Sequence, residues 1–480
     1  MRTRFAPSPT GYMHLGNLRT ALFGYLLARN MGGTFVLRIE DTDQGRYIEG
    51  ALDAIYNTLK IVGITYDEGP DKPGNYGPYV QSERKANYMD YAKQLIEKGA
   101  AYYCFCDKER LEGMEGYDRK CVHLSKEEID KNLAAGMSFV VRQLIPEGKT
   151  TFSDLVFGDI TVDNSEMEDQ VLIKSDGMPT YNFANVVDDH LMAITHVIRG
   201  SEYLPSTPKY NLLYEALGWE IPAYVHMPLI LSAGGGKLSK RHGDAYFEDF
   251  INKGFLPEAI INYIALLGWS PPALELELGL DNREIYSISE LTEIFGIEGI
   301  SKSPAIFDIN KLKWVNGEYL KTMDFEAFYQ IAEEYIAGSV KNTCTDKRQL
   351  AKMVQGRISV LSEIPEILDF IDTLPEYSLE LYTHKKSKCD ADIAESVLAK
   401  LASVLMEYNE DNWQNDKLYE FLTNFAQSEG LKNSQVLWPV RTAVSGKEAT
   451  PGGASDLLFI LGKDESVSRI TFALQKLKER

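Results

Sequence analysis

The fold is decided at residues 4–17, which read RFAPSPTGYMHLGN. Thr3–Ala6 is a β-rich run, and the apolar residues of Leu15–Asn30 recur at the three- and four-residue spacing of an amphipathic helix. His14 and Gly16 therefore lie where a strand passes into a helix. Unpaired backbone N–H groups and the helix dipole make such a helix start a favourable place for an anion.

A second stretch, far downstream, complements the first. Residues 233–241 read AGGGKLSKR, a run of glycines followed by a basic pentamer. Closing such an arm over a triphosphate would set ammonium groups against developing charge, and one preorganised donor of this kind is worth on the order of 100- to 1000-fold in rate. Alone, the pentamer is more often a solvated loop and the histidine a helix cap. Together they predict adenylate chemistry, with His14, Lys237 and Lys240 as the catalytic residues.

The sequence around both stretches alternates in the manner of an α/β protein. Phe35–Ile39 is a continuous apolar strand that ends in Glu40, and helical periods follow over Ile48–Lys60 and Ser82–Lys98. The pattern resumes with a strand at Ala193–Ile198. This alternation predicts a Rossmann-like, doubly wound parallel sheet with ligands at the carboxyl ends of its strands.

Changes in this pattern divide the chain into segments. Residues 101–187 consist of short β-rich pieces and turns, which indicates an α+β insertion, and residues beyond 320 show only helical periods. The predicted segments are the first half of a catalytic domain at 1–100, an inserted domain at 101–187, the second half of the catalytic domain at 188–244, a helical domain at 245–320, and two helical subdomains at 321–375 and 376–480.

Composition and charge limit the classes of protein to which the chain can belong. Of its 480 residues 44% are hydrophobic and 25% are charged, which is typical of a globular protein. We find no run of about 18 uncharged apolar residues and no signal peptide, so no membrane partner is expected. Five cysteines are too few for a disulfide framework, which predicts a reducing, cytoplasmic setting. The formal charge of −20 argues mildly against nucleic-acid binding.

Several segments together resemble the glutamyl-tRNA synthetase family, a branch of the class I aminoacyl-tRNA synthetases. They are the stretch at 4–17, RIEDTD at Arg38–Asp43, YNFANVVDDH at Tyr181–His190, the segment Lys237–Asp244, and LWPVR at Leu437–Arg441. HLGN at His14–Asn17 stands for the class signature His-Ile-Gly-His, and KLSKR for Lys-Met-Ser-Lys-Ser. Both departures are those expected of the glutamyl branch.

The resemblance implies a reaction, partners and an ATP site. The expected reaction is the ATP- and Mg²⁺-dependent ligation of L-glutamate to the 3′-terminal adenosine of tRNA(Glu), through glutamyl-adenylate, by a monomer. The inserted domain would hold the acceptor end, residues 245–320 the stem, and residues 321–480 the anticodon. Trp438, Arg441 and the lysines around Lys432 are candidate RNA contacts, although packing is the commoner role of a tryptophan in helices. The residues expected to bind ATP are His14, Gly16, Asn17, Lys237, Ser239, Lys240 and Arg241.

Glutamate presents two carboxylates and one ammonium to its pocket. Arg4 and Arg199 are candidates for the carboxylates because a guanidinium matches a carboxylate with two parallel hydrogen bonds, and Glu40 is a candidate for the ammonium. Without the resemblance, the two arginines are more often surface charges. An arginine facing the γ-carboxylate would reject glutamine, whose amide opposes donors with donors. The resemblance adds Ser8, Tyr181 and Asn185 to the polar shell.

Cys104, Cys106, Cys121 and His123 form the pattern C-x-C…C-x-H across fourteen intervening residues. Four N/S ligands suit a tetrahedral, structural Zn²⁺. The alternative is a set of unrelated thiols, but three of only five cysteines cluster beside a histidine, which favours a metal. The spacer is shorter than is usual in zinc-bearing relatives, and some members of the family have lost the ion. The other histidines, His226 among them, belong to no such pattern, and we expect them either to be structural or to support the residues that contact the substrate.

Rival interpretations stay open at this point. Glutaminyl-tRNA synthetase shares the catalytic architecture, but its anticodon part is β-rich, whereas residues 320–480 are predicted helical. A truncated paralogue that glutamylates a modified tRNA base lacks the C-terminal half. A catalytically idle RNA-binding or scaffold protein is disfavoured by the presence of His14, Lys237 and Lys240. Charging of tRNA(Gln) as well as tRNA(Glu), and activation with or without prior tRNA binding, are all compatible with the sequence.

Overall fold

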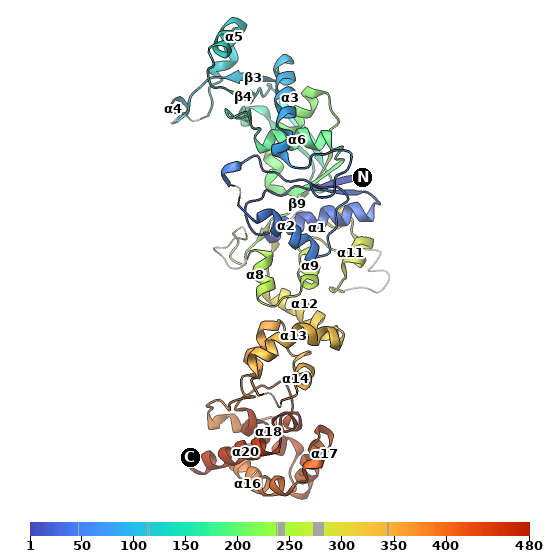
Figure 1. Cartoon of the computed structure of the whole chain (residues 1–480), viewed down its shortest axis with the longest axis vertical. Coiled ribbons are helices and arrows are strands. Elements are labelled where there is room, and N and C mark those ends of the chain that lie inside the picture. The colour runs from blue at the N-terminus through green and yellow to red at the C-terminus, as the bar shows by residue number, and fades with distance from the viewer. Residues whose placement is uncertain are drawn as a thin grey trace. The chain divides into compact units, whose positions relative to one another are not determined.

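The computed structural model describes every residue except 47, 113, 115, 237, 239–244, 272–282 and 343–344. The chain divides into two compact units. Unit 1 consists of residues 1–252 and 256–312, and unit 2 of residues 253–255 and 313–480. In Figure 1 the colours from blue to yellow mark unit 1, and gold to red mark unit 2.

Strands and helices alternate through most of unit 1. In chain order its elements are β1 (Arg2–Phe5), α1 (Leu15–Asn30), β2 (Thr34–Leu37), α2 (Ala51–Ile61), α3 (Lys85–Glu97), β3 (Ala101–Cys104), α4 (Lys108–Leu111), α5 (Lys126–Ala134), β4 (Val140–Gln143), β5 (Lys149–Asp154), β6 (Gly158–Asp163), β7 (Val171–Ile173), α6 (Tyr181–Leu191), β8 (His196–Gly200), α7 (Thr207–Leu217), β9 (Ala223–Met227), β10 (Ile230–Leu231), α8 (Phe247–Asn252), α9 (Pro257–Ala265), α11 (Ile288–Ile294), β11 (Ala305–Ile306) and α12 (Ile309–Thr322), the last of which continues into unit 2.

The first strand and helix form where the sequence predicts them. Strand β1 pairs in parallel with β2, from Arg2 opposite Thr34 to Phe5 opposite Leu37. Helix α1 starts after His14 and buries the predicted apolar face, including Leu18 and Leu22. Parallel pairing brings the carboxyl ends of both strands to one edge, which is where a ligand site is expected.

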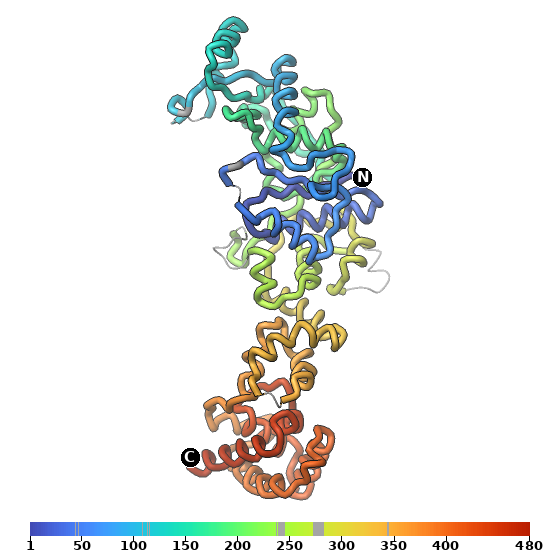
Figure 2. Tube along the Cα trace, viewed as in Figure 1, coloured from blue at the N-terminus to red at the C-terminus, as the bar shows by residue number. Residues whose placement is uncertain are grey.

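Strands from distant parts of the sequence complete this edge. Strand β8 pairs in parallel with β9, and β1 runs alongside β8, where the Thr195 N–H donates to the Arg2 carbonyl oxygen at 3.0 Å. Figure 2 shows the blue N-terminal strands beside the green segment around residues 195–227. Glu40, which follows β2, and Arg199, on β8, therefore lie at the same edge although the sequence separates them widely.

The region predicted as one insertion is divided between two sheets. Strands β3, β4 and β7 form a separate antiparallel sheet, but the hairpin of β5 and β6 joins the catalytic sheet in the order β6-β5-β9-β8. Asp154 of β5 is paired with Tyr224 of β9. Helix α6 crosses the predicted boundary at 187 and packs against α3 and α7. Alternation along β5 reveals a half-buried strand, but the partner of that strand is set by tertiary contacts.

Unit 2 is built from helices in the part of it that the structure describes. Its elements after α12 are α13 (Phe325–Ser339), α14 (Lys347–Val354), α15 (Ile364–Leu368), α16 (Ala391–Glu407), α17 (Asn415–Ser428), α18 (Asn433–Ser445), α19 (Ala454–Leu461) and α20 (Lys463–Lys478). Helix α16 packs against α20, and α17 against α19. Across the described residues of both units, no helix combines the length and the apolar character that crossing a bilayer requires.

Candidate active site

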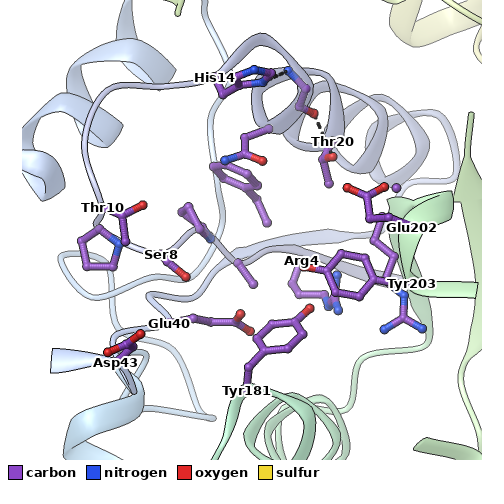
Figure 3. Close-up of a pocket in the computed structure, with 18 of the residues that line it drawn as sticks. Arg4, Ser8, Thr10, His14, Thr20, Glu40, Asp43, Tyr181, Glu202 and Tyr203 are labelled. Atoms are coloured by element: carbon purple, nitrogen blue, oxygen red, sulfur yellow. Dashed lines mark hydrogen bonds between the residues drawn. The ribbon is translucent and has the colours of Figure 1, made fainter. Parts of the chain in front are cut away.

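A cavity of about 740 Å³ opens in unit 1 at the carboxyl ends of β1, β2 and β8. Figure 3 shows its two ends, with His14 at the start of α1 and with Glu40 and Tyr181 on the opposite side. Eight residues that the sequence predicted for the site line it: Arg4, Ser8, His14, Gly16, Asn17, Glu40, Tyr181 and Arg199. The edge of the sheet thus collects side chains from β1, the loop after it, the chain after β2, α6 and β8.

Both ring nitrogens of His14 have hydrogen-bond partners. Its Nδ1 accepts the Gly16 N–H at 3.0 Å, so the ring caps α1, and its Nε2 lies 3.1 Å from the Leu238 carbonyl oxygen. Because Nδ1 is the acceptor, Nε2 carries the proton and donates to Leu238. A side-chain carbon added at Gly16 would lie 3.3 Å from His14 Nδ1 and crowd the ring. The helix-cap interpretation of His14 is therefore correct, and the residue also lines the cavity.

The basic pentamer falls mostly outside the described residues, which include none of Lys237, Ser239, Lys240 and Arg241. Residues on both sides of them are held beside His14. The Leu238 carbonyl oxygen contacts the His14 ring, the Leu15 N–H donates to the Ala245 carbonyl oxygen at 2.9 Å, and the Phe247 N–H donates to that of Met13 at 2.9 Å. The two stretches that are remote in sequence therefore meet at the start of α1.

Four buried charges form a chain beneath the cavity. Arg4 makes two hydrogen bonds to Asp189, from Nε at 3.1 Å and from Nη2 at 3.2 Å. Arg38 donates to Asp189 at 2.7 Å and to Glu40 at 2.9 Å. Two guanidinium groups and two carboxylates thus balance one another, and Arg4, expected to bind a substrate carboxylate, already has a carboxylate partner.

The pKa values of the two carboxyls in this chain shift in opposite directions. Burial alone would raise the pKa of Asp189, but the charges of Arg4 and Arg38 outweigh burial and hold it below its ordinary value. Burial raises the pKa of Glu40, and Arg38 and Arg4 only partly oppose that shift. Glu40 is the member at the cavity wall, and a cation bound there would favour its ionised form.

Arg199 differs from Arg4 because no carboxylate pairs with it among the residues that the structure describes. Its side chain is 5% exposed, with Nε bonded to His226 at 3.0 Å and Nη2 to Thr207 at 2.8 Å. Three tyrosine rings surround the guanidinium, those of Tyr203, Tyr210 and Tyr224, with centroids 4.8–5.3 Å away. A buried cation at a cavity wall favours an anionic ligand.

The remaining predicted members of the polar shell are placed differently. Ser8 is exposed on the loop after β1, and Tyr181 begins α6 with its ring 5.6 Å from that of Tyr203. Asn185, one turn later, is buried and is not part of the cavity wall. Its Nδ2 has no hydrogen-bond partner among the described residues. The structure therefore brings Ser8 and Tyr181 to the cavity and leaves Asn185 beneath its surface.

Residue-by-residue reasoning assigned no role at the site to Arg38, Asp189 or His226. Arg38 stands between Leu37 and Ile39, Asp189 follows Asp188 directly after two valines, and His226 interrupts the apolar strand β9. A charged or titratable residue inside an apolar run is the signal that could have identified them, since such a residue is buried only with a partner.

The predicted cysteine cluster forms, but without its histidine. The Sγ atoms of Cys104, Cys106 and Cys121 lie within 4.8 Å of one another, with 3.5 Å between Cys106 and Cys121. His123 is exposed and is not in this group. The Tyr117 hydroxyl instead lies 3.1 Å from Cys104 Sγ and 3.8 Å from Cys106 Sγ. The short helical turn at Lys120–His123 turns Cys121 inward and His123 outward.

Known families match both units. Residues 1–314 match the family described as "tRNA synthetases class I (E and Q), catalytic domain", and residues 318–474 match "Anticodon binding domain". The predicted α/β fold with a helical C-terminal region is thereby confirmed.

The chain is also similar to individual proteins over its full length. It is 54% identical over 489 residues to the glutamate–tRNA ligase of Clostridium botulinum (strain Eklund 17B / Type B), covering 100% of this chain and 99% of that protein. Its fold is similar to the crystal structure of a glutamate tRNA ligase from Elizabethkingia meningosepticum in complex with its amino acid, with a TM-score of 0.86 and 34% identity over 99% of each chain. The corresponding values for glutamate-tRNA synthetase from Elizabethkingia anophelis are 0.88 and 34% over 99% of each chain.

Proposed function

The chain belongs to the glutamate–tRNA ligases, a branch of the class I aminoacyl-tRNA synthetases, and from that premise we propose how its residues serve the reaction. It is an enzyme that attaches glutamate to tRNA, and it binds tRNA, glutamate and ATP with Mg²⁺. In the proposed sequence the α-carboxylate of glutamate attacks the α-phosphate of ATP in line, which releases pyrophosphate and leaves glutamyl-adenylate. The 2′-hydroxyl of the terminal adenosine of tRNA(Glu) then attacks the carbonyl carbon of glutamyl-adenylate, which forms the ester, breaks the acyl–phosphate bond and releases AMP.

One observation carries the assignment of glutamate to this cavity. Arg199 is a buried guanidinium at the wall with no carboxylate partner among the described residues, whereas Arg4 is already paired with Asp189. A buried charge is stabilised only by an opposite charge, so Arg199 favours the side-chain carboxylate of a glutamate ligand. Glutamine would place an amide NH₂ against the same donors, and such a mismatch can cost about 10⁴- to 10⁵-fold.

The other polar groups of the cavity complete the glutamate subsite. Glu40 would hold the α-ammonium, since its carboxylate is fixed by Arg38 and faces the cavity. Arg4 donates from Nε and Nη2 to Asp189 and from Nη1 to the Ile198 carbonyl oxygen, and it would contribute the N–H groups that these bonds leave to the α-carboxylate. Ser8, Tyr181 and Asn185 stay proposals for the polar shell, and for Asn185 the unpartnered buried Nδ2 is the support.

The ATP subsite is proposed at the start of α1. His14, Gly16 and Asn17 line the cavity there, and the flanks of the segment that contains Lys237, Ser239, Lys240 and Arg241 are held beside His14. Little covalent chemistry falls to these side chains, because positioning and charge stabilisation do most of the work in phosphate transfer reactions.

Replacement of His14 by asparagine separates its two roles. Asparagine is as good an N-cap as any residue, so the free energy of unfolding should change by less than about 1 kcal/mol. The Nε2 donor is lost, and kcat for aminoacylation should fall on the order of 100-fold. Thermal melting and steady-state charging assays check both values. If the asparagine variant charges tRNA at the wild-type rate, His14 is only a helix cap.

A structural Zn²⁺ is proposed at the cysteine cluster because the donor set fits it. Tetrahedral zinc with four thiolates would separate sulfurs by roughly 3.8 Å, and Cys106 and Cys121 are 3.5 Å apart. The sequence predicts His123 as the fourth ligand, but the structure supports the Tyr117 hydroxyl, which contacts two of the thiols. The ion would tie the chain around residue 121 to β3, away from the reacting atoms.

Metal analysis of four proteins tests this site. The purified wild type and the His123→Ala variant should each hold about one zinc per chain, whereas Cys104→Ser should lose most of it and Tyr117→Phe should hold it more weakly. Loss of zinc from His123→Ala together with retention in Tyr117→Phe would restore the histidine as ligand. Less than about 0.2 zinc per chain in the wild type, with no loss of stability in Cys104→Ser, would remove the metal altogether.

Unit 2 is proposed to read the anticodon, and its geometry refines which residues are candidates. The ring of Trp438 stacks on His384 at 3.7 Å, and the Arg441 guanidinium lies 4.3 Å from the same ring. Two groups at such distances cannot share one face, so both faces of Trp438 are covered and neither is left for a base. Lys432 is exposed, and Arg441 is partly buried, with its fork bonded to Thr450 and to the Glu448 carbonyl oxygen.

We propose a monomer in the cytoplasm as the working form. The four cysteines among the described residues are all free, as expected in a reducing compartment.

Parallel charging assays with purified tRNA(Glu) and tRNA(Gln) test the function itself. Charging of tRNA(Glu) with glutamate is the expected result, and failure to charge either tRNA under any substrate order would overturn it.

A further inference from the structure

His226 is a completely buried histidine on β9 that the proposed reaction does not use. Its Nδ1 lies 2.6 Å from Asp154 Oδ2, and its Nε2 lies 3.0 Å from Arg199 Nε. The side chain therefore connects a carboxylate on β5 to the guanidinium that we assign to substrate binding. Thr207, also completely buried, holds a second nitrogen of that guanidinium, Nη2, at 2.8 Å.

The hydrogen bonds of Asp154 determine which nitrogen of His226 carries the proton. Asp154 Oδ1 accepts the backbone N–H groups of Val156 and Phe157, and Oδ2 accepts the backbone N–H of His226 at 3.1 Å. A carboxylate bonded in this way has only acceptors to offer, so His226 Nδ1 must be the protonated nitrogen. The lone pair of Nε2 then faces Arg199 Nε–H, which is a donor.

The pKa shifts agree with this assignment. Burial lowers the pKa of His226, which keeps the ring neutral although the bond to Asp154 opposes that shift. Burial opposes ionisation of Asp154, but the bonds from His226 and from the backbone outweigh burial and lower its pKa. A neutral imidazole beside an ionised carboxylate is the state in which Nε2 is an acceptor.

These contacts leave Arg199 little freedom. Nε–H and one N–H of Nη2 are held by His226 and Thr207, and three tyrosine rings surround the guanidinium. Three N–H groups remain, two on Nη1 and one on Nη2. One N–H from each of these nitrogens can meet a carboxylate with two parallel bonds.

We infer that Asp154, His226 and Thr207 are positioning residues, which fix the plane of the Arg199 guanidinium so that its remaining N–H groups meet the side-chain carboxylate of glutamate. This inference rests on the proposed role of Arg199. A fixed fork presents two donors to two acceptors, whereas a mobile one can turn a single donor to the oxygen of a glutamine amide. The positioning residues therefore serve the choice of glutamate over glutamine as well as affinity.

The inference also gives a reason for the β5–β6 hairpin to join the catalytic sheet. Pairing of Asp154 with Tyr224 on β9 brings the carboxylate next to His226, two residues further along the same strand. A hairpin that belonged only to the inserted domain could not place a carboxylate beside His226.

Two replacements of His226 separate positioning from packing. In His226→Asn the side-chain nitrogen replaces Nδ1 and keeps the bond to Asp154, but nothing replaces Nε2. In His226→Gln an oxygen reaches the place of Nε2 and still accepts from Arg199. We expect His226→Asn to raise KM for glutamate about 10- to 100-fold, because a bond to a charged group is lost, and His226→Gln to stay within about 5-fold of wild type.

The measurement is aminoacylation by the full-length enzyme at saturating ATP and tRNA, with glutamate varied and glutamine as a competitor. KM for ATP should be unchanged in both variants, and the thermal melts should match. His196→Asn, at the amino end of β8 and outside the cavity, is the control. Where His226→Asn does not fold, Thr207→Val removes the acceptor of Nη2, together with the hydroxyl that donates to the Tyr203 carbonyl oxygen, and should raise KM for glutamate several-fold.

Each outcome decides the inference. Equal KM values for the asparagine and glutamine variants, or a wild-type KM in both His226→Asn and Thr207→Val, would overturn it. If Arg199→Ala itself leaves KM for glutamate unchanged, the assigned role of Arg199 fails and the inference with it. If Arg199→Ala loses glutamate while the His226 and Thr207 variants do not, the function stands and only the positioning role fails.

Discussion

Arg199→Ala is expected to lower kcat/KM for glutamate on the order of 1000-fold while leaving ATP binding unchanged. The guanidinium is buried at the cavity wall with no ion-pair partner among the described residues, so its removal leaves the substrate carboxylate desolvated and unpaired. Truncating one member of a buried, hydrogen-bonded charge pair costs about 2–5 kcal/mol, and each 1.4 kcal/mol is tenfold. His14 lies on the opposite side of the cavity from Glu40 and Tyr181, so binding of ATP at the start of α1 should not be disturbed (Figure 3).

Arg199→Lys is the matched control for this prediction. Lysine keeps the charge but loses the planar fork, so it should recover part of the affinity for glutamate and less of the discrimination against glutamine. Charging rates with each amino acid and equilibrium binding of ATP provide the readouts. Near-normal formation of glutamyl-adenylate by Arg199→Ala would show that Arg199 is not part of the site.

Asp189→Asn is expected to lower the free energy of unfolding by about 3–5 kcal/mol. Asp189 is the carboxylate between Arg4 and Arg38, and all three side chains are almost completely buried. Asparagine has the same shape, so no cavity forms, but two guanidinium groups are left in the interior with only Glu40 to neutralise them. The loss of unfolding free energy therefore measures the cost of leaving buried guanidinium charge uncompensated.

The pH dependence of the loss provides a second test. Because the pKa of Asp189 is lower in the folded protein than in the unfolded chain, its stabilising contribution is complete above the unfolded value and disappears as the pH falls through the folded one. The difference in stability between wild type and Asp189→Asn should therefore shrink on acidification below about pH 4. Glu40 acts in the opposite sense, since its raised pKa favours folding at low pH.

Denaturant unfolding across this pH range is the measurement. Glu284→Gln, which removes a half-exposed pair with Lys311, is the control and should cost less than about 1 kcal/mol. If both variants lose a similar amount of unfolding free energy at neutral pH, the buried ion pairs of Asp189 stabilise the fold no more than an exposed ion pair does.

Local structure and the family were predictable from the sequence, because both depend on short segments. The strand at the N-terminus, the helix from Leu15 to Asn30 and the helices after residue 320 follow from apolar spacing and from helix signals within a few residues. The signatures at 4–17 and 237–244 likewise consist of adjacent residues. The prediction that these two stretches act on the same triphosphate rested only on the presence of both in one chain.

The state of each charged side chain was decided by the tertiary structure. Arg4 and Arg199 are indistinguishable in the sequence, yet Arg4 is neutralised by Asp189 from α6 and Arg199 is held by His226 from β9. Tyr117, not His123, reaches the three thiols for the same reason, since the direction of a side chain depends on the backbone turn that carries it. Pairing and burial join residues that lie from 13 positions apart, as for Cys104 and Tyr117, to 185 positions apart, as for Arg4 and Asp189. No pattern of neighbours along the chain specifies which of them will meet.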